Sequence, residues 1–280
     1  MTKLLHVGVI TLATFSFQQS NILEEIRQLR LLVLPGPTEV RYPPGGVKRA
    51  EGVQALLDDA RAFFRLRFQQ SPDLTIALLG PTEWRAFNNN QPIAYTTMLP
   101  GVFGRNPAVM VLASETGSGL DALVQRVNPN AEAGLRYNVL VGLHELGHLY
   151  VTALALPVTE SWFSEFLATY IAYGYLRDMR PEDADFWQAT CQALYKELSH
   201  PITALEAVHT QVGVENYVWY QSSLQLRVDE LYRQRGWQFV DGLQKETEGS
   251  LGKGPQLRMN LERLAPGFAT WARTNHSETS

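Results

Sequence analysis

The sequence has little cysteine and little excess charge, and each shortage excludes a class of protein. Its 280 residues include a single cysteine, Cys191, which excludes an internal disulfide and a CxxC metal or redox motif. The net charge is −4 and no long basic or acidic run is present, which argues against nucleic-acid binding. Beyond the N-terminus, no apolar segment is long enough to cross a bilayer. We therefore expect a globular protein without a transmembrane span.

The first twenty residues have the pattern of a secretory signal. A basic start at residues 1–3 precedes a mostly apolar run over 4–17, which is too short to span a bilayer. Small residues near Ala13 and Ser16 suit a cleavage site. We predict a signal peptide over residues 1–20 and a secreted or periplasmic protein. The alternative is a buried N-terminal strand, because Thr, Val, Ile and Phe favour strands, and a cytoplasmic location.

The next part of the chain combines short strands with a helix. A stripe of apolar residues at helical spacing predicts a helix over residues 48–69, and Trp84 and Phe87 indicate a short one. Residues 88–107 are rich in Asn, Gly and Pro, which predicts a long loop or an irregular hairpin, either covering a cleft or extending into solvent. Strands are predicted within 31–42, as strand, turn and strand, and over 74–79 and 108–113.

After about residue 125, nearly every segment is predicted to be helical. Asn130 is the expected N-cap of a long helix that Pro157 ends. Further helices are predicted over 160–178, from Pro181, and over 214–235 with its end at Gly236. We therefore predict an α+β fold in a single domain over 21–280. It comprises a small mixed sheet with a helix over 21–125, a mainly helical part over 126–265 and a tail over 266–280.

The segment His144-Glu145-Leu146-Gly147-His148 is an HExxH motif within an apolar helix. Residues four apart lie on one helix face, so His144 and His148 can direct two imidazoles at one metal ion. Glu145 is rotated toward the open side of that ion, where its carboxylate could accept a proton from water. The alternative is a pair of core histidines with a glutamate that pairs with an arginine.

The composition around this motif favours the metal site. From Val139 to Leu156 the helix is apolar nearly all round, which predicts a buried helix. A buried carboxylate is costly without a partner, so Glu145 needs a charge or hydrogen-bond donors nearby. A divalent metal ion would meet that need, and we predict a single zinc ion as the cofactor.

A second apolar helix offers a third metal ligand. Catalytic zinc takes three protein ligands and leaves one position for water or substrate. Glu165 is the only charged residue between Ser161 and Leu176, so its carboxylate is isolated in an apolar helix. We predict Glu165 as the ligand and Glu160 as the fallback, because the macrodipole already favours an acidic residue at the helix start. The short connection between the two helices predicts antiparallel neighbours that could share one ion.

Together, the two motifs resemble those of the gluzincin zinc metallopeptidases. The HExxH motif is followed by Trp162-Phe163-Ser164-Glu165-Phe166-Leu167-Ala168-Thr169-Tyr170, which is similar to the Trp-Leu-Ser-Glu-Gly-Leu-Ala-Glu-Tyr pattern of the bacterial peptidase MA-like group. The resemblance covers about residues 38–240 and is specific only in these two motifs. It implies a thermolysin-like zincin core, zinc held by His144, His148 and Glu165, and Glu145 as general base. It also implies hydrolysis of a peptide or protein substrate that lies extended along an edge strand.

Two residues depart from the family pattern. Phe166 stands where the family often has glycine, and Thr169 stands where it often has an acidic residue that can orient a zinc histidine. Thr169 can still accept a hydrogen bond, but it carries no charge. An alternative function is therefore a degenerate peptidase-like protein that binds metal and serves as a binding module. A further alternative is a structural helical protein without a metal.

Amide hydrolysis passes through an oxyanion, and a hydrogen-bond donor besides the metal would stabilise it. Tyr220, Tyr217 and His209 are candidates in the later helical region, and we select Tyr220 because it resembles a recurring tyrosine of the family. The chain has 11 tyrosines, so packing is the alternative role. No function is assigned to the remaining candidates, which are His200 at a helix end, His6 and His276 in terminal segments, and Cys191 in the core.

Overall fold

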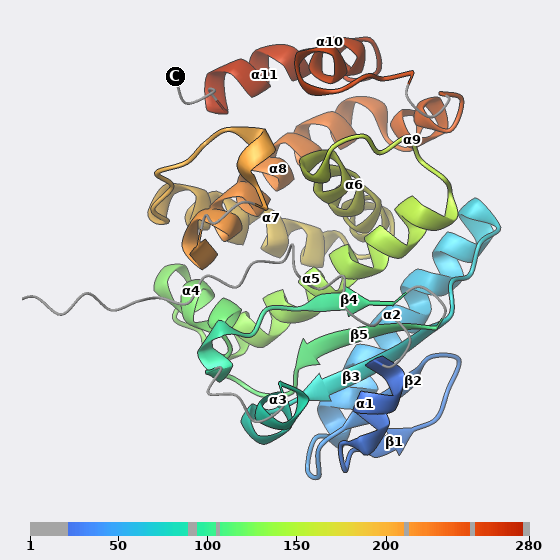
Figure 1. Cartoon of the computed structure of the whole chain (residues 1–280), viewed down its shortest axis with the longest axis vertical. Coiled ribbons are helices and arrows are strands. Elements are labelled where there is room, and N and C mark those ends of the chain that lie inside the picture. The colour runs from blue at the N-terminus through green and yellow to red at the C-terminus, as the bar shows by residue number, and fades with distance from the viewer. Residues whose placement is uncertain (1–21, 89–93, 105–106, 210–212, 247–249, 277–280) are drawn as a thin grey trace, which may run out of the picture.

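The computed structural model describes residues 22–88, 94–104, 107–209, 213–246 and 250–276, which form a sheet part and a helical part (Figure 1). The sheet is small and mixed and the rest is mostly helical, which confirms the predicted α+β class. The predicted signal peptide over 1–20 lies outside the described residues. No helix in the described ranges is long and apolar enough to cross a membrane.

The sheet has five strands in the order β1-β2-β3-β5-β4. The three central strands run parallel, and each outer strand is antiparallel to its neighbour. The pairing of β4 with β5 confirms an irregular hairpin in the predicted loop 88–107, of which residues 89–93 and 105–106 lie outside the described residues. The strands are β1 (Leu32–Leu34), β2 (Glu39–Tyr42), β3 (Leu74–Leu79), β4 (Gly101–Phe103) and β5 (Ala108–Ala113).

Helices cover both faces of the central strands. Ile76 of β3 and Met110 of β5 pack into the main core with α2 (Val47–Phe68) and α5 (Ala131–Ala153). The alternate residues Ala77 and Val111 face a second, smaller cluster with α1 (Ile22–Gln28) and α3 (Pro81–Phe87). Burial on both faces explains why β3 and β5 are continuous apolar runs rather than alternating sequences.

The helical part is built from helices whose ends follow local sequence signals. The Asn130 side chain accepts a hydrogen bond from the Glu132 N–H at the start of α5, as predicted for an N-cap. Helix α4 begins at Gly119, before the boundary that the sequence suggested at 126, and the Ser118 hydroxyl accepts a hydrogen bond from the Asp121 N–H at its start. The remaining elements are α4 (Gly119–Val127), α6 (Ser161–Met179), α7 (Pro181–Glu197), α8 (Gly213–Arg235), α9 (Gln238–Leu243), α10 (Gly254–Leu264) and α11 (Phe268–Asn275), with short 3-10 helices η2 (Tyr95–Thr97) and η3 (Leu205–Ala207).

The segment predicted as a tail contains α11, which packs into the core through Phe268 and Ala272. His276 follows this helix and is 4% exposed. Its Nδ1 lies 2.8 Å from the Thr203 carbonyl oxygen and its Nε2 lies 2.8 Å from the Ser223 hydroxyl of α8. A neutral imidazole satisfies both contacts, with Nδ1 donating and Nε2 accepting.

His276 should therefore make the protein sensitive to acid. Burial lowers the pKa of His276 to about 4, although its hydrogen bond to the Thr203 backbone opposes the shift. Between pH 6.5 and 4 the unfolded chain binds a proton at this histidine and the folded chain does not. The free energy of unfolding therefore decreases as the pH is lowered through that window. We expect the acid-induced decrease in the free energy of unfolding to be smaller in His276→Asn than in wild type, by up to about 3 kcal/mol. Denaturant titrations at pH 7 and pH 4.5 measure it, and an unchanged pH dependence in the variant would contradict the assignment.

Helices α5 and α6 pack closely and antiparallel, as predicted. Gly147 of α5 lies against Ala168 of α6, where a Cβ added to the glycine would stand 2.9 Å from the Ala168 Cα and closer still to its carbonyl oxygen. Real Cβ atoms do not approach backbone so closely, so only glycine permits this separation of the two helices. The close packing brings the side chains of α6 within reach of the histidines on α5.

Replacing Gly147 with alanine should force α5 and α6 apart. We expect Gly147→Ala to cost about 1–3 kcal/mol of unfolding free energy, because both neighbours are backbone atoms that cannot rotate away. The matched control is Gly52→Ala in α2, where a Cβ meets nothing within 4 Å and the alanine should stabilise the helix by up to about 1 kcal/mol. Urea titrations compare the two, and equal stability changes would refute the role of Gly147.

Candidate metal centre

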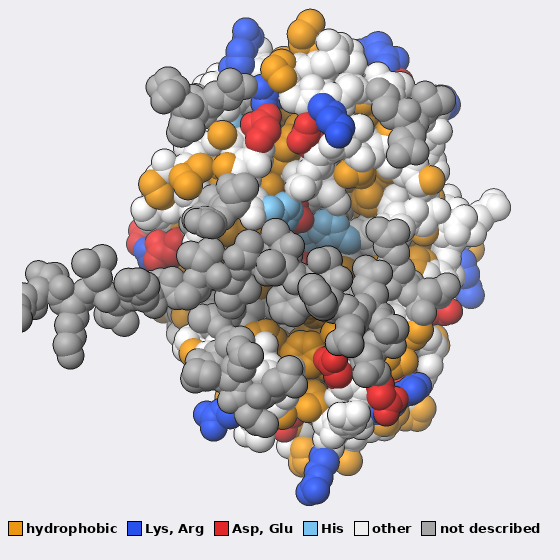
Figure 2. Space-filling view, viewed as in Figure 1, with side chains coloured by type: hydrophobic (Ala, Val, Ile, Leu, Met, Phe, Trp, Pro, Cys, Tyr) orange, Lys and Arg blue, Asp and Glu red, His pale blue; other side chains and the backbone are white. Residues whose placement is uncertain are grey.

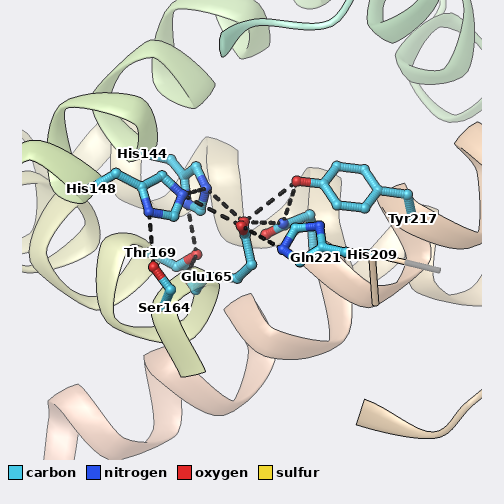
Figure 3. A network of polar contacts seen from close by, with 8 residues as sticks. All are labelled: His144, His148, Ser164, Glu165, Thr169, His209, Tyr217 and Gln221. Atoms are coloured by element: carbon cyan, nitrogen blue, oxygen red, sulfur yellow. Dashed lines mark hydrogen bonds and ion pairs between the residues drawn. The ribbon is translucent and has the colours of Figure 1, made fainter. Parts of the chain in front are cut away.

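Three side chains from α5 and α6 converge on one point (Figure 3). His144 Nε2 lies 3.1 Å from Glu165 Oε2, and His148 Nε2 lies 3.6 Å from Glu165 Oε1. The two Nε2 atoms are 3.1 Å apart. His144 and Glu165 are buried, and His148 is partly exposed to solvent. The structure thus brings together the three residues that the sequence suggested as metal ligands.

The spacing of these atoms suits tetrahedral zinc. Zinc binds imidazole nitrogen and carboxylate oxygen at about 2.0–2.2 Å, so neighbouring tetrahedral ligands stand about 3.3 Å apart. The two Nε2 atoms are 3.1 Å apart, and each lies 3.1–3.6 Å from one oxygen of the Glu165 carboxylate, His144 from Oε2 and His148 from Oε1, so the separations are close to that value. Two imidazoles and one carboxylate also form a known catalytic zinc set, with a fourth position left for water or substrate. The residues therefore fit the predicted ion in donor type and in spacing.

Hydroxyl groups of α6 orient both imidazoles. The Thr169 hydroxyl donates to the Glu165 carbonyl oxygen at 2.9 Å, so it can only accept from His144 Nδ1, also at 2.9 Å. This places a proton on His144 Nδ1, and a metal ion bound at Nε2 would take the place of the proton that Nε2 otherwise donates to Glu165. Ser164 Oγ lies 3.3 Å from His148 Nδ1 and can do the same there. Thr169 thus accepts the hydrogen bond from His144 although it carries no charge, unlike the acidic residue that often stands at this position in the family.

A second group of donors reaches Glu165 from the other side, from α8 and the segment before it (Figure 3). Gln221 Nε2 donates to Glu165 Oε2 at 2.6 Å and to the Tyr217 hydroxyl oxygen at 2.9 Å. The Tyr217 hydroxyl lies 3.4 Å from Glu165 Oε2, and His209 Nε2 lies 3.2 Å from Oε1. Both oxygens of the Glu165 carboxylate are therefore held in place by side chains that belong to separate elements.

The electrostatics of the cluster favour a positive charge at its centre. Burial would raise the pKa of Glu165, but the charge of His148 and hydrogen bonds from His144, His148 and His209 outweigh it and hold the pKa well below its usual range. Burial would lower the pKa of His148, but Glu165 raises it to about 9. A negative carboxylate therefore faces two imidazoles at short range. A divalent metal ion would supply the positive charge that this arrangement favours.

Glu145 lies beside the cluster, between α5 and strand β4. Burial raises the pKa of Glu145, and the nearby charge of Glu165 adds to the effect, whereas His144, His148 and a hydrogen bond from the Val102 backbone of β4 oppose it. The net shift of the Glu145 pKa is upward, which makes this carboxylate a stronger base than an exposed glutamate. The motif residue predicted as a general base thus adjoins the three clustered side chains.

The other two candidate residues are not part of the cluster. The fallback ligand Glu160 lies at the N-cap of α6, and its carboxylate accepts a hydrogen bond from the Gly254 N–H at 3.0 Å. The fully buried Tyr220 donates its hydroxyl hydrogen to the Ala204 carbonyl oxygen at 2.5 Å, so this hydrogen is not directed at the cluster. Its neighbour Gln221 is rotated by about 100° around the helix axis and does face Glu165. The geometry therefore favours Tyr217 and His209 over Tyr220 as donors at the site.

Sequence reasoning missed Gln221 and Ser164. Gln221 is four residues after Tyr217, so the two share one face of α8, and this spacing was the available signal. Ser164 directly precedes the candidate ligand Glu165, but a serine on the first turn of a helix is common and carries no specific signal. Of the residues to which no function was assigned, Cys191 is buried as expected, with its Sγ 3.2 Å from the Tyr137 hydroxyl.

Comparison with known proteins does not identify the chain. No protein-family model, curated protein or solved structure matches it. The similarity to gluzincin peptidases therefore remains a prediction from the two motifs, and any function has to be argued from the arrangement of the side chains.

The hydrogen bond from His144 to Thr169 should matter for metal binding. We expect Thr169→Val to weaken zinc binding about 10–100-fold, because the nearly isosteric valine cannot accept the Nδ1 proton that fixes the His144 ring. Thr169→Ser keeps the hydroxyl and should bind zinc nearly as well as wild type. Competition titrations against a zinc chelator measure both affinities. Equal affinities for the valine and serine variants would show that this hydroxyl does not orient His144 for metal binding.

Proposed function

We propose that the protein is a zinc-dependent peptidase of the gluzincin type. The observation that carries the proposal is the convergence of His144, His148 and Glu165 at separations that suit zinc, with Glu145 beside them. A zinc ion bound there would act as a Lewis acid for a substrate carbonyl and for water. The same arrangement would be costly in a purely structural core, because it buries the Glu165 carboxylate and the His144 imidazole and partly buries Glu145 and His148.

Glu145 is proposed as the general base. Its carboxylate adjoins the ligand cluster, and its raised pKa allows it to take a proton from the attacking water and to pass it to the leaving amine. The Val102 N–H holds this carboxylate next to β4, the last strand in the order of the sheet. Among the described residues β4 has a neighbouring strand on one side only, so its other edge can pair with an extended peptide. The edge strand would thus align the substrate with Glu145.

Tyr217 is proposed as the main donor to the oxyanion, with His209 beside it. Gln221 donates to the Tyr217 oxygen, so the hydroxyl hydrogen of Tyr217 remains available to point into the site. Its contact with Glu165 is long, at 3.4 Å, so little hydrogen-bond energy is lost when the hydrogen turns to a substrate oxygen. A neutral donor in this position would stabilise charge that develops only as the carbonyl is attacked.

The general-base role predicts a variant that binds metal but does not turn over. Glu145→Gln keeps the size of the side chain and removes its basicity, so we expect one zinc ion per chain and about 10²–10⁴-fold slower hydrolysis of a broad peptide pool. Mass spectrometry of the pool and elemental analysis of the protein provide the two readouts. Glu182→Gln, at an exposed position of α7, is the control for loss of one negative charge.

The same assay separates the peptidase from its alternative. If wild type and Glu145→Gln both bind zinc and both leave the pool intact, the protein is a metal-binding peptidase-like module rather than an enzyme. The neutral Thr169, in place of an acidic residue, is the observation that favours this alternative, because a neutral partner makes His144 a weaker electron donor to the metal.

A further inference from the structure

An open pocket adjoins the metal centre along the N-terminal end of α6. Its volume is about 380 Å³, and it reaches Glu165 at one end. Figure 2 shows histidine and acidic side chains together in a hollow near the middle of this face. The pocket is lined by residues 158–161, Ser164, Glu165 and His209. Because it begins at a metal ligand, a substrate bound at the centre would place one of its side chains here.

The two carboxylates of this pocket, Glu165 and Glu160, differ in the cationic groups that surround them. Glu165 is surrounded by His144, His148 and His209, and its charge belongs to the metal centre. Glu160 accepts one hydrogen bond from the Gly254 N–H and, among the described residues, forms no ion pair with a cationic side chain. No lysine or arginine is among the residues that line the pocket. Glu160 thus leaves a net negative charge in the wall.

Hydrogen bonds from the segment that leads into α10 fix the position of Glu160. The hydrogen bond from Gly254 holds the carboxylate at the pocket, and the adjacent Thr159 hydroxyl donates to the Gly252 carbonyl oxygen at 2.7 Å. The segment before α10 therefore fixes the backbone and side chain at the start of α6. The α6 macrodipole offsets about half a unit of negative charge at this end, which leaves the wall acidic.

We propose that this pocket is a subsite for a lysine or arginine side chain of the peptide substrate, with Glu160 as its ionic partner. Residues 160 and 165 are about 7.5 Å apart along the axis of α6, a distance that a long cationic side chain can bridge from a backbone held at the metal centre. Ammonium and guanidinium groups donate charge-assisted hydrogen bonds to a carboxylate, and the hydroxyls in the wall can accept others. The inference rests on the proposed peptidase function.

Pairs of quenched fluorescent peptides test this subsite. Members of a pair differ only in lysine or uncharged norleucine at one position, which is moved in turn through the residues on either side of the cleaved bond. We expect wild type to prefer lysine at one position by about tenfold in kcat/KM, and Glu160→Gln to lose most of that preference. High salt should reduce the preference, because the pocket is open to solvent. Glu182→Gln should keep it, and zinc content should be equal in all three proteins.

The outcomes distinguish this proposal from the proposed function. If wild type hydrolyses peptides without favouring lysine at any position, or if Glu160→Gln keeps the preference, the subsite is wrong and the peptidase stands. If nothing is hydrolysed, the peptidase is wrong, and fluorescence anisotropy of the same peptides on the zinc-loaded protein decides the subsite. Tighter binding of the lysine peptide that Glu160→Gln abolishes supports it, and equal binding of both peptides overturns it.

Discussion

The close contact between α5 and α6 is the constraint on which the candidate site depends. Gly147 lets the backbone of α6 approach at Ala168, and the antiparallel direction then sets Glu165 opposite both histidines of α5. The same approach brings the hydroxyls of α6 to the far nitrogens of the two imidazoles. One helix pair thus supplies the candidate metal ligands and the groups that orient them, which explains how a precise arrangement arises from two apolar helices.

The polar groups at this contact are the physical argument for the proposed metal ion. Glu165 and His144 are buried on two helices whose other buried residues are mostly apolar, and burial of charge is costly unless it is fully paired. Donors from α8 satisfy part of Glu165, but the two Nε2 atoms lie 3.1 Å apart, where only one of them can direct a proton at the other. A shared cation relieves both problems at once. A cation at this point would both stabilise the buried polar groups and support the proposed hydrolysis. This is a reason to propose that the cluster binds a metal ion and is not a coincidental group of polar side chains.

The sequence predicted α5 and α6 well because their signals are local. The Asn130 cap, the apolar run and the isolated Glu165 can all be identified without knowing the fold. Short strand β4 is different, since it is a strand only through its pairing with β5. The face of α8 is also set by tertiary packing: this helix is buried around most of its circumference, so periodicity could not show that Gln221 and not Tyr220 meets Glu165. The start of α4 also has a local signal in the sequence, because Ser118 and Asp121 are spaced as in an N-terminal capping motif.

The central claim is that His144, His148 and Glu165 hold one zinc ion, and zinc stoichiometry tests it most directly. The protein would be purified without added metal, stripped with a chelator, reloaded and measured by elemental analysis, beside a variant in which both histidines are replaced by alanine. The account predicts one zinc ion per wild-type chain that returns after stripping, and none in the double variant. Sub-stoichiometric zinc in the wild type that does not rise on reloading would contradict it.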